Sequence, residues 1–189
     1  MGDETTIGWC RRRRADGSLM PGRTFNPWWG CTKVSPACNA CYAETWAKRV
    51  GQDIWGHRAP RRFFGAEHWK APLRWNREAQ EMDEQHLVFC ASMADVFERR
   101  ADLRPHRDRL WRLIDETPYL VWLLLAKRKP IVPWTGRWPD NVWLGVTVES
   151  PAYLWRVEAA LEHDAPASTR QVFARLWPSI RLIDLTPGK

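Results

Sequence analysis

The chain has 189 residues and a mass of 22.2 kDa, which predicts one domain, or one domain with a short appendage. Hydrophobic residues make up 44% and charged residues 27%, and this balance excludes a disordered, collagen-like or coiled-coil protein. No window approaches the roughly 18 uncharged apolar residues of a membrane span, and the first residues lack the apolar run of a secretory signal. We therefore expect a cytoplasmic protein that does not associate with membranes.

Tryptophan content and charge are both unusual. The chain contains 14 tryptophans and carries a formal net charge of +7. Phosphates attract Lys and Arg and bases stack on aromatic rings, so nucleic acid is a candidate partner. Residues 48–77 carry eight Lys and Arg against two acidic residues, with Trp55, Trp69 and Trp75 among them. A GC-rich genome would give the same Arg- and Trp-rich composition, so both interpretations stay open.

The first third of the chain predicts a polar segment, a strand and a helix. Residues 1–20 are a polar, basic N-terminal segment in which the four arginines at 11–14 are expected to be solvated, and residues 21–189 form the single domain. A short strand running into a loop is expected at 24–32. Residues 38–50 have helical character, with Tyr42, Trp46 and Val50 on one face. Residues 51–77 are expected to be mostly loop.

The remainder of the chain alternates between apolar runs and amphipathic segments. Buried strands are predicted at 87–93, which includes Cys90 as a core residue, and at 119–126 and 141–148. Helices are predicted at 104–117 and 151–163, and further strand material at 170–174 and 180–185. Near-continuous apolar strands that alternate with helices indicate an α/β fold with a mostly parallel sheet of four to five strands flanked by helices.

Functional groups of such sheets gather at the carboxyl ends of the strands. Polar groups follow each of the predicted strands. These groups are the cysteines at 31–41, residues 92–95, Lys127 with Arg128, and residues 147–149. We therefore expect them to converge on one edge of the sheet.

Three cysteines are crowded into eleven residues, with the spacing Cys31-x6-Cys38-x2-Cys41. Disulfides are disfavoured in the cytosol, so crowded thiols are first interpreted as metal ligands. A structural zinc site needs a fourth protein ligand, for which the sequence offers Cys10, His57 and His68 at unorthodox spacings. A 4Fe-4S cluster needs only three cysteines and leaves one iron free for a substrate. Three unligated thiols in a loop are the third interpretation.

The cysteine segment and three later blocks resemble a known family. The segment reads TFNPWWGCTKVSP at 24–36 and CNACYAE at 38–44, and the later blocks are SMADVF at 92–97, LLAKR at 124–128 and NVWLGVTVE at 141–149. Together they resemble the phage gene-product 37/68 family, a domain-of-unknown-function family, across roughly residues 20–150. The cysteine segment with its flanks is the specific part of the match.

That family is similar to radical S-adenosylmethionine proteins, which fold as full or partial (β/α) barrels. The resemblance implies a partial barrel in which Cys31, Cys38 and Cys41 hold a 4Fe-4S cluster. S-adenosylmethionine would bind the fourth iron through its amino and carboxylate groups. One electron from a donor such as flavodoxin or ferredoxin would then cleave the sulfonium, giving a 5′-deoxyadenosyl radical that abstracts hydrogen from an unknown substrate.

Strand-end position suggests roles for five further residues. Ser92 and Asp95 would hydrogen-bond the methionine moiety, Lys127 and Arg128 would meet a carboxylate or phosphate, and Glu149 would bond a ribose hydroxyl. Ordinary structural roles compete with each assignment. Asp95 would cap a helix, the two cations would be solvated, and Glu149 would lie in the first turn of a helix.

The chain also departs from the pattern that it resembles. The first cysteine gap is six residues where radical S-adenosylmethionine proteins usually have three, and Tyr42 follows the last cysteine where an aromatic residue usually precedes it. Ala126 replaces a usual Thr, and the glycine-rich final block is absent. These departures indicate a shortened or diverged member, for which loss of activity is one alternative. The net charge, the arginine run and residues 48–77 support a second alternative, a zinc-containing nucleic-acid-binding protein. A third alternative is a truncated, inactive relic that oligomerises through an exposed strand edge.

Overall fold

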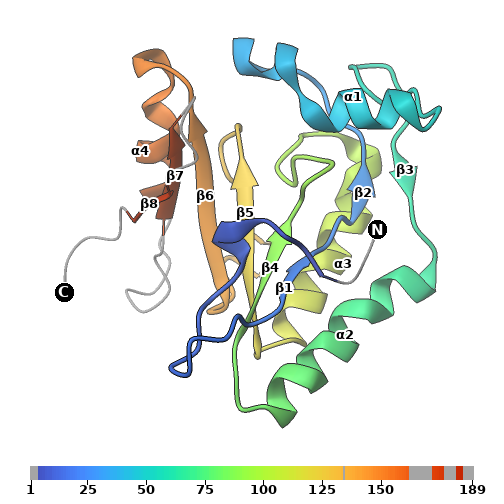
Figure 1. Cartoon of the computed structure of the whole chain (residues 1–189). Helices are drawn as coiled ribbons and strands as arrows, with labels where there is room; N and C mark the ends of the chain where they lie inside the picture. The colour runs from blue at the N-terminus through green and yellow to red at the C-terminus, as the bar shows by residue number, and fades with distance from the viewer. Residues whose placement is uncertain (1–3, 134, 162–171, 177–181, 185–189) are drawn as a thin grey trace.

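The computed structural model describes residues 4–133, 135–161, 172–176 and 182–184, and its centre is a sheet in the order β1-β4-β5-β6-β7-β8 (Figure 1). The strands are β1 Gly22–Thr24, β4 His86–Cys90, β5 Leu120–Ala126, β6 Val142–Val148, β7 Val172–Leu176 and β8 Leu182–Asp184. Strands β1 to β7 of this sheet pair in parallel, and β8 pairs antiparallel with β7. The predicted α/β fold with a mostly parallel sheet is confirmed. Within the described residues the sheet stays open, as a partial barrel requires.

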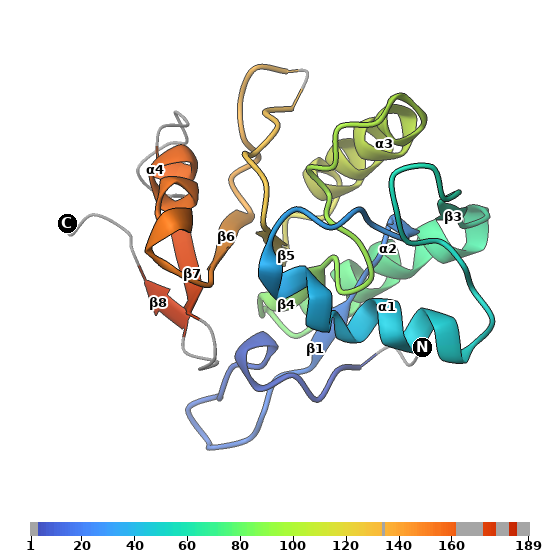
Figure 2. The same ribbon diagram turned by 90° about the horizontal axis from the view of Figure 1, so that it is seen from above.

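Helices cover one face of the sheet and one of its ends. The helices are α1 Tyr42–Arg49, α2 Ala66–Glu81, α3 Arg104–Asp115 and α4 Trp155–Leu161. Viewed from above, α2 and α3 lie outside the sheet on the same side, while α1 crosses above the ends of the strands (Figure 2). A small antiparallel pair, β2 Trp28–Trp29 with β3 Arg62–Phe63, stands beside the main sheet. None of the described helices is long and apolar enough to cross a membrane.

The prediction of a loop-rich segment at 51–77 is confirmed up to Gly65, apart from the short β3, and is wrong from Ala66, where α2 begins. The buried residues of this helix are Trp69, Pro72, Trp75 and Ala79, which recur every three to four residues along one stripe. Lys, Arg and Glu on the other face hid this stripe in the sequence. Trp69 and Trp75 pack in the core, so they do not belong to the aromatic nucleic-acid surface that residues 48–77 suggested.

The predicted helix is observed as α1, but the face that carries its large apolar residues is not the face that it buries. Tyr42, Trp46 and Val50 are 60%, 37% and 45% exposed, whereas Ala43 and Ala47 are buried. The two alanines pack with Trp29, Ile54 and Met93 in one cluster. Because alanine is small, it lets the helix backbone approach the protein closely, and the larger residues remain outside.

Both faces of the sheet are buried, which explains the uninterrupted apolar runs. In β4, Val88 and Cys90 face the core under α2 and α3, and Cys90 is the core residue that the sequence predicted. Leu87 and Phe89, which alternate with them, belong to a second cluster on the opposite face. That second face is covered by the N-terminal segment.

The segment 1–20 is therefore not a solvated tail in its described part. Cys10 is fully buried in the second cluster, with Ile7 and Trp9 packed against it. A Cβ atom on Gly22 would lie 2.3 Å from the Cys10 carbonyl oxygen, so glycine is required where the segment crosses β1. The arginine run is anchored as well, because Arg14 forms an ion pair with Glu84.

Candidate functional site

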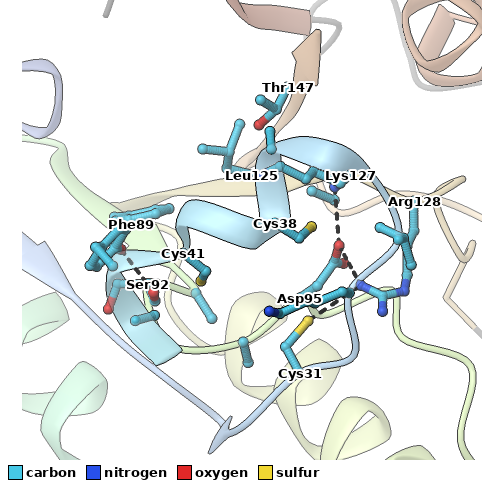
Figure 3. A pocket seen from close by; sticks show the side chains of 18 of the residues that line it. Cys31, Cys38, Cys41, Phe89, Ser92, Asp95, Leu125, Lys127, Arg128 and Thr147 are labelled. Carbon is cyan, nitrogen blue, oxygen red and sulfur yellow. Dashed lines mark hydrogen bonds and ion pairs between the residues drawn. The ribbon is translucent and has the colours of Figure 1, made fainter. Parts of the chain in front are cut away.

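A pocket of about 430 Å³ opens at the carboxyl edge of the sheet, below α1 (Figure 3). It brings together seven of the eight residues that the sequence singled out: Cys31, Cys38, Cys41, Ser92, Asp95, Lys127 and Arg128. Figure 3 shows the three sulfur atoms around one space, with Asp95 and Arg128 beside Cys31. The expected convergence of strand-end groups is thus observed, and we refer to this site as the cysteine pocket.

Cys31 is positioned by the glycine that precedes it. Gly30 has φ +108°, and a Cβ atom there would lie 2.4 Å from the Ile54 carbonyl oxygen. Its N–H donates to the Met93 carbonyl at 3.0 Å, which ties the cysteine loop to the segment after β4. A side chain at position 30 would be both strained and obstructed, so this turn requires glycine.

Cys38 and Cys41 come from the turn that leads into α1. Cys38 lies in the 3₁₀ helix Pro36–Ala40, and Cys41 directly precedes α1. Glu44 in the first turn of α1 pairs with Lys48 at 2.8 Å and with Lys33 at 3.1 Å. The pair with Lys33 fastens the loop between the first two cysteines to the helix.

The surroundings shift the pKa values of Cys31 and Cys38 in opposite directions. Burial raises the pKa of the Cys31 thiol to about 12; the carboxylate of Asp95 adds to this effect and Arg128 opposes it. Burial also acts on Cys38, but hydrogen bonds from the backbone and from Ser35 outweigh it and lower the pKa of that thiol. Cys38 is therefore the more readily ionised of these two thiols.

Asp95 joins the ends of two strands. Its Oδ2 accepts hydrogen bonds from the Lys127 backbone N–H at 3.0 Å and from Arg128 Nη1 at 2.9 Å. Its Oδ1 accepts from the Phe97 N–H at 3.0 Å, so Asp95 caps a turn rather than a helix. With three donors already on its two oxygens, Asp95 chiefly holds the segments after β4 and β5 in register.

Arg128 continues this connection to the cysteine loop. Its Nη2 donates to the Thr32 carbonyl at 2.7 Å, and its Nη1 lies 3.5 Å from Cys31 Sγ. Burial alone would lower the pKa of the guanidinium, but the charges of Asp95 and Cys31 and the hydrogen bonds to both residues together outweigh it and raise the pKa. Arg128 therefore stays charged beside the Cys31 sulfur.

Ser92 is held by Asn26, a residue that the sequence analysis missed. Asn26 is 1% exposed; its Nδ2 donates to Ser92 Oγ at 3.1 Å, and its Oδ1 accepts from the Met93 N–H at 2.7 Å. The Tyr42 hydroxyl donates to the Ser92 carbonyl at 2.8 Å. Asn26 stands inside the segment that carried the family resemblance, and an amide among aromatic residues was the available signal.

Lys127 and Glu149 differ in whether another side chain pairs with their charge. The Lys127 ammonium lines the cysteine pocket and forms no ion pair or hydrogen bond with another described side chain. Glu149 lies outside the lining and pairs with Arg156 at 2.6 Å. Thr147, two residues earlier on β6, lines the pocket instead.

A buried ion pair supports the pocket from behind. The Arg61 side chain is fully buried and binds both carboxylate oxygens of Glu98, at 3.1 Å through Nε and 2.7 Å through Nη2. It also donates to the Thr32 hydroxyl at 2.9 Å and to the Ile54 carbonyl at 3.1 Å. Part of the basic charge at 48–77 is therefore structural, which composition alone did not reveal.

The N-terminal segment supplies a wall that the sequence analysis also missed. Ile7, Gly8 and Trp9 line the cysteine pocket, and the Trp9 ring meets Phe89 edge to face at 4.6 Å. Residues 7–10 are the only compact apolar stretch before residue 19, and that stretch was the available signal.

The donor set of the pocket fits an iron–sulfur cluster by its chemistry. Three cysteines offer thiolate ligands, and Arg128 and Lys127 supply positive charge beside them. No group of three or more His, Cys, Asp or Glu side chains in the described ranges is arranged to hold a metal ion, so the fit rests on the kind of donor and not on the geometry. Cys10, His57 and His68, the residues considered as a fourth zinc ligand, do not line this pocket.

The searches of curated proteins and of solved structures gave no match. A family profile described as "Protein of unknown function (DUF5131)" matches residues 4–185, nearly the whole chain. The match includes the N-terminal segment, which covers the face of the sheet opposite to α2 and α3. The chain therefore belongs to the DUF5131 family.

Proposed function

We propose that this protein is an iron–sulfur protein of the radical S-adenosylmethionine type, as the resemblance to the phage gene-product family implied. One observation carries the proposal. Cys31, Cys38 and Cys41 line a single pocket with strand-end polar groups at the carboxyl edge of a parallel sheet. A cytoplasmic setting goes with the proposal, because five free thiols suit a reducing compartment.

The bound cluster and S-adenosylmethionine would supply one-electron reductive cleavage of the sulfonium. The three cysteines would hold the cluster, and Arg128 would place a positive charge beside Cys31. Lys127 would bind the carboxylate of S-adenosylmethionine, since its ammonium has no other described side-chain partner. Asp95 is assigned to positioning, because its two oxygens already accept three hydrogen bonds.

The N-terminal segment would keep water away from the reacting groups. Ile7 and Trp9 form the wall of the cysteine pocket on the face of the sheet that α2 and α3 leave uncovered. A radical reaction needs such exclusion, because a reactive species is quenched by unintended partners. A pocket of about 430 Å³ also falls within the range of small-molecule sites.

Anaerobic reconstitution with iron and sulfide tests the proposal. We expect about four irons per chain and an electron paramagnetic resonance signal, after reduction, that shifts when S-adenosylmethionine is added. The Cys31→Ala/Cys38→Ala/Cys41→Ala variant should take up no cluster. The matched control is Cys10→Ala/Cys90→Ala, which alters two buried cysteines outside the pocket and should reconstitute as the parent does.

Two outcomes would overturn the proposal. One is zinc in the protein as isolated together with no cluster on reconstitution, which would favour the zinc-containing alternative. The other is equal iron uptake by the triple variant, provided that circular dichroism finds it folded. Lys127→Ala sharpens the test, because it should weaken S-adenosylmethionine binding about tenfold in calorimetry while leaving the iron content unchanged.

A further inference from the structure

A second pocket of about 360 Å³ adjoins the cysteine pocket at the same edge of the sheet. Four residues line both pockets: Thr32, Val34, Lys127 and Arg128. The other lining residues come from the segments after β4 and after β6, together with Lys129 and His57. The two pockets are therefore neighbouring compartments that share one wall.

The second pocket is strongly basic. Its lining contains six Lys and Arg side chains: Arg99, Arg100, Lys127, Arg128, Lys129 and Arg156. The only acidic residue in that lining is Glu98, and the buried Arg61 already neutralises it. Three of the six cations are paired with carboxylates outside the lining, namely Arg100, Arg128 and Arg156. The positive charge that remains favours an anionic ligand.

Some of these cations are fixed and others are available. Arg100 is held by Asp102 and Arg128 by Asp95. Arg99 is exposed and has no partner among the described side chains. The Lys127 side chain is half-buried, and its ammonium forms no ion pair with a described side chain. A ligand would thus meet a rigid basic wall and, in Arg99, a cationic group that it alone would pair.

Aromatic rings stand at the rim of this pocket. Tyr153 and Trp155 line it, and Trp155 is 43% exposed. The Arg156 guanidinium lies 4.3 Å from the centre of the Tyr153 ring and 5.6 Å from that of Trp155. Arg156 is itself anchored to Glu149 and to the Thr147 carbonyl, so the rings are held at the end of β6.

We propose that this basic pocket binds the phosphate groups of a single-stranded nucleic acid, with a base stacked on Trp155. Cationic side chains track the backbone and aromatic rings receive the bases in sites of this kind. An acidic peptide would use the charge but would leave the exposed ring without a function. A base can stack on Trp155 only when it is unpaired, so the single strand is favoured over the duplex.

The shared wall gives the pocket a role as a substrate site. A strand held in the basic pocket, beside the wall that the two pockets share, would present a nucleotide to the cysteine pocket. That the strand is a substrate rests on the function proposed above. That the strand binds to the basic pocket does not rest on it, because none of the binding contacts requires a cluster.

Fluorescence anisotropy of the full chain as isolated, without reconstitution, tests the binding. The probes are fluorescein-labelled single strands of about 12 nucleotides, one of deoxythymidine and one of uridine. The parent should bind a single strand more tightly than the matching duplex, and the two probes distinguish DNA from RNA. Three phosphate contacts would weaken binding about 20-fold between about 50 and 200 mM salt.

Two variants remove the two halves of the site. Trp155→Ala should weaken binding about tenfold with an unchanged salt slope, because stacking carries no charge. Arg99→Ala/Lys129→Ala should weaken binding and lower the magnitude of the salt slope by about 1.4. The matched controls are Leu154→Ala, an exposed apolar neighbour, and Lys70→Ala/Arg77→Ala on α2, none of which lines the pocket.

Equal binding by Trp155→Ala and by its Leu154→Ala control would overturn the stacking assignment and with it the proposal. Duplex bound as tightly as single strand, or no anisotropy change at low salt, would overturn it as well. Free uridine monophosphate that competes as well as the strand would replace the strand with a mononucleotide. A protein that forms a cluster but binds no strand would keep the proposed function and lose this inference, and the reverse result would do the opposite.

Discussion

The two faces of the sheet are both apolar but are covered by different kinds of structure. On one face, called the outer face here, α2 and α3 bury a large cluster that includes Trp111 and Trp122. The opposite face, the inner face, is covered by the irregular N-terminal segment, of which Ile7, Trp9 and Cys10 contact the sheet. The outer cover is built from periodic helices, and the inner cover is built from a few separate contacts.

This difference determines where stability and function reside. The helical face contributes most of the buried apolar area, and apolar burial is the dominant favourable term in folding. The inner face contributes less area, but its cover is also a wall of the cysteine pocket. Substitutions on the outer face should therefore mainly lower the free energy of unfolding. Substitutions on the inner face should mainly change the access of reagents to the pocket thiols.

The largest expected effect is at Trp122 on the helical face. Its side chain is fully buried, and its Nε1 donates to the Thr117 hydroxyl at 3.0 Å. Trp122→Ala should lower the free energy of unfolding by about 3–5 kcal/mol, because it leaves a large cavity. Urea denaturation followed by circular dichroism measures this change. Trp155→Ala, at an exposed ring, should stay within about 0.5 kcal/mol of the parent, and an equal loss in both variants would contradict the comparison.

A smaller loss with a clearer functional signature is expected at Trp9 on the inner face. Trp9→Ala removes the edge-to-face contact with Phe89 and should cost about 1–2 kcal/mol. It also opens the wall of the pocket, so a thiol reagent should modify the pocket cysteines faster than in the parent. The two core cysteines, Cys10 and Cys90, should react only on unfolding in the parent. An unchanged rate for the three pocket thiols would contradict the assignment of Trp9 as a wall.

The same contrast explains what could be predicted from the sequence. The strands at 86–90, 120–126 and 142–148 were predicted because strands buried on both faces are nearly continuous apolar runs. The convergence of the cysteines with Ser92, Asp95, Lys127 and Arg128 followed from the parallel topology alone. In both cases a general rule connects local pattern to position.

The missed features depend on pairings between distant segments, which local patterns do not encode. Arg61 and Glu98 are 37 residues apart, and each resembles an ordinary surface charge in the sequence. In α2 the buried stripe was hidden by charged neighbours, and in α1 small alanines were buried in place of large aromatics. The N-terminal cover has no periodicity, so only its few apolar residues could have indicated its position.

The smallest expected effect concerns the ion pair that fastens the N-terminal segment. Arg14 Nη2 donates to Glu84 Oε2 at 2.9 Å, and His86 Nε2 lies 3.1 Å from the same oxygen. Hydrogen bonding to Arg14 lowers the pKa of Glu84 from 4.5 to about 2. Because the folded pKa lies below the unfolded value, the pair stabilises the protein above about pH 4.5. This contribution is lost as the pH falls from 4.5 towards 2.

Glu84→Gln should therefore be slightly less stable than the parent at pH 7, and the difference should shrink towards zero near pH 2. Urea denaturation of both proteins at several pH values measures it, and the subtraction cancels the titration of the other carboxylates. Glu67→Gln, at an exposed carboxylate on α2, is the control and should be about as stable as the parent at pH 7. The pair lies at the protein surface with both side chains partly exposed, and surface ion pairs contribute little to stability. A larger effect here than at Trp9 would mean that charge rather than apolar contact holds the inner cover in place.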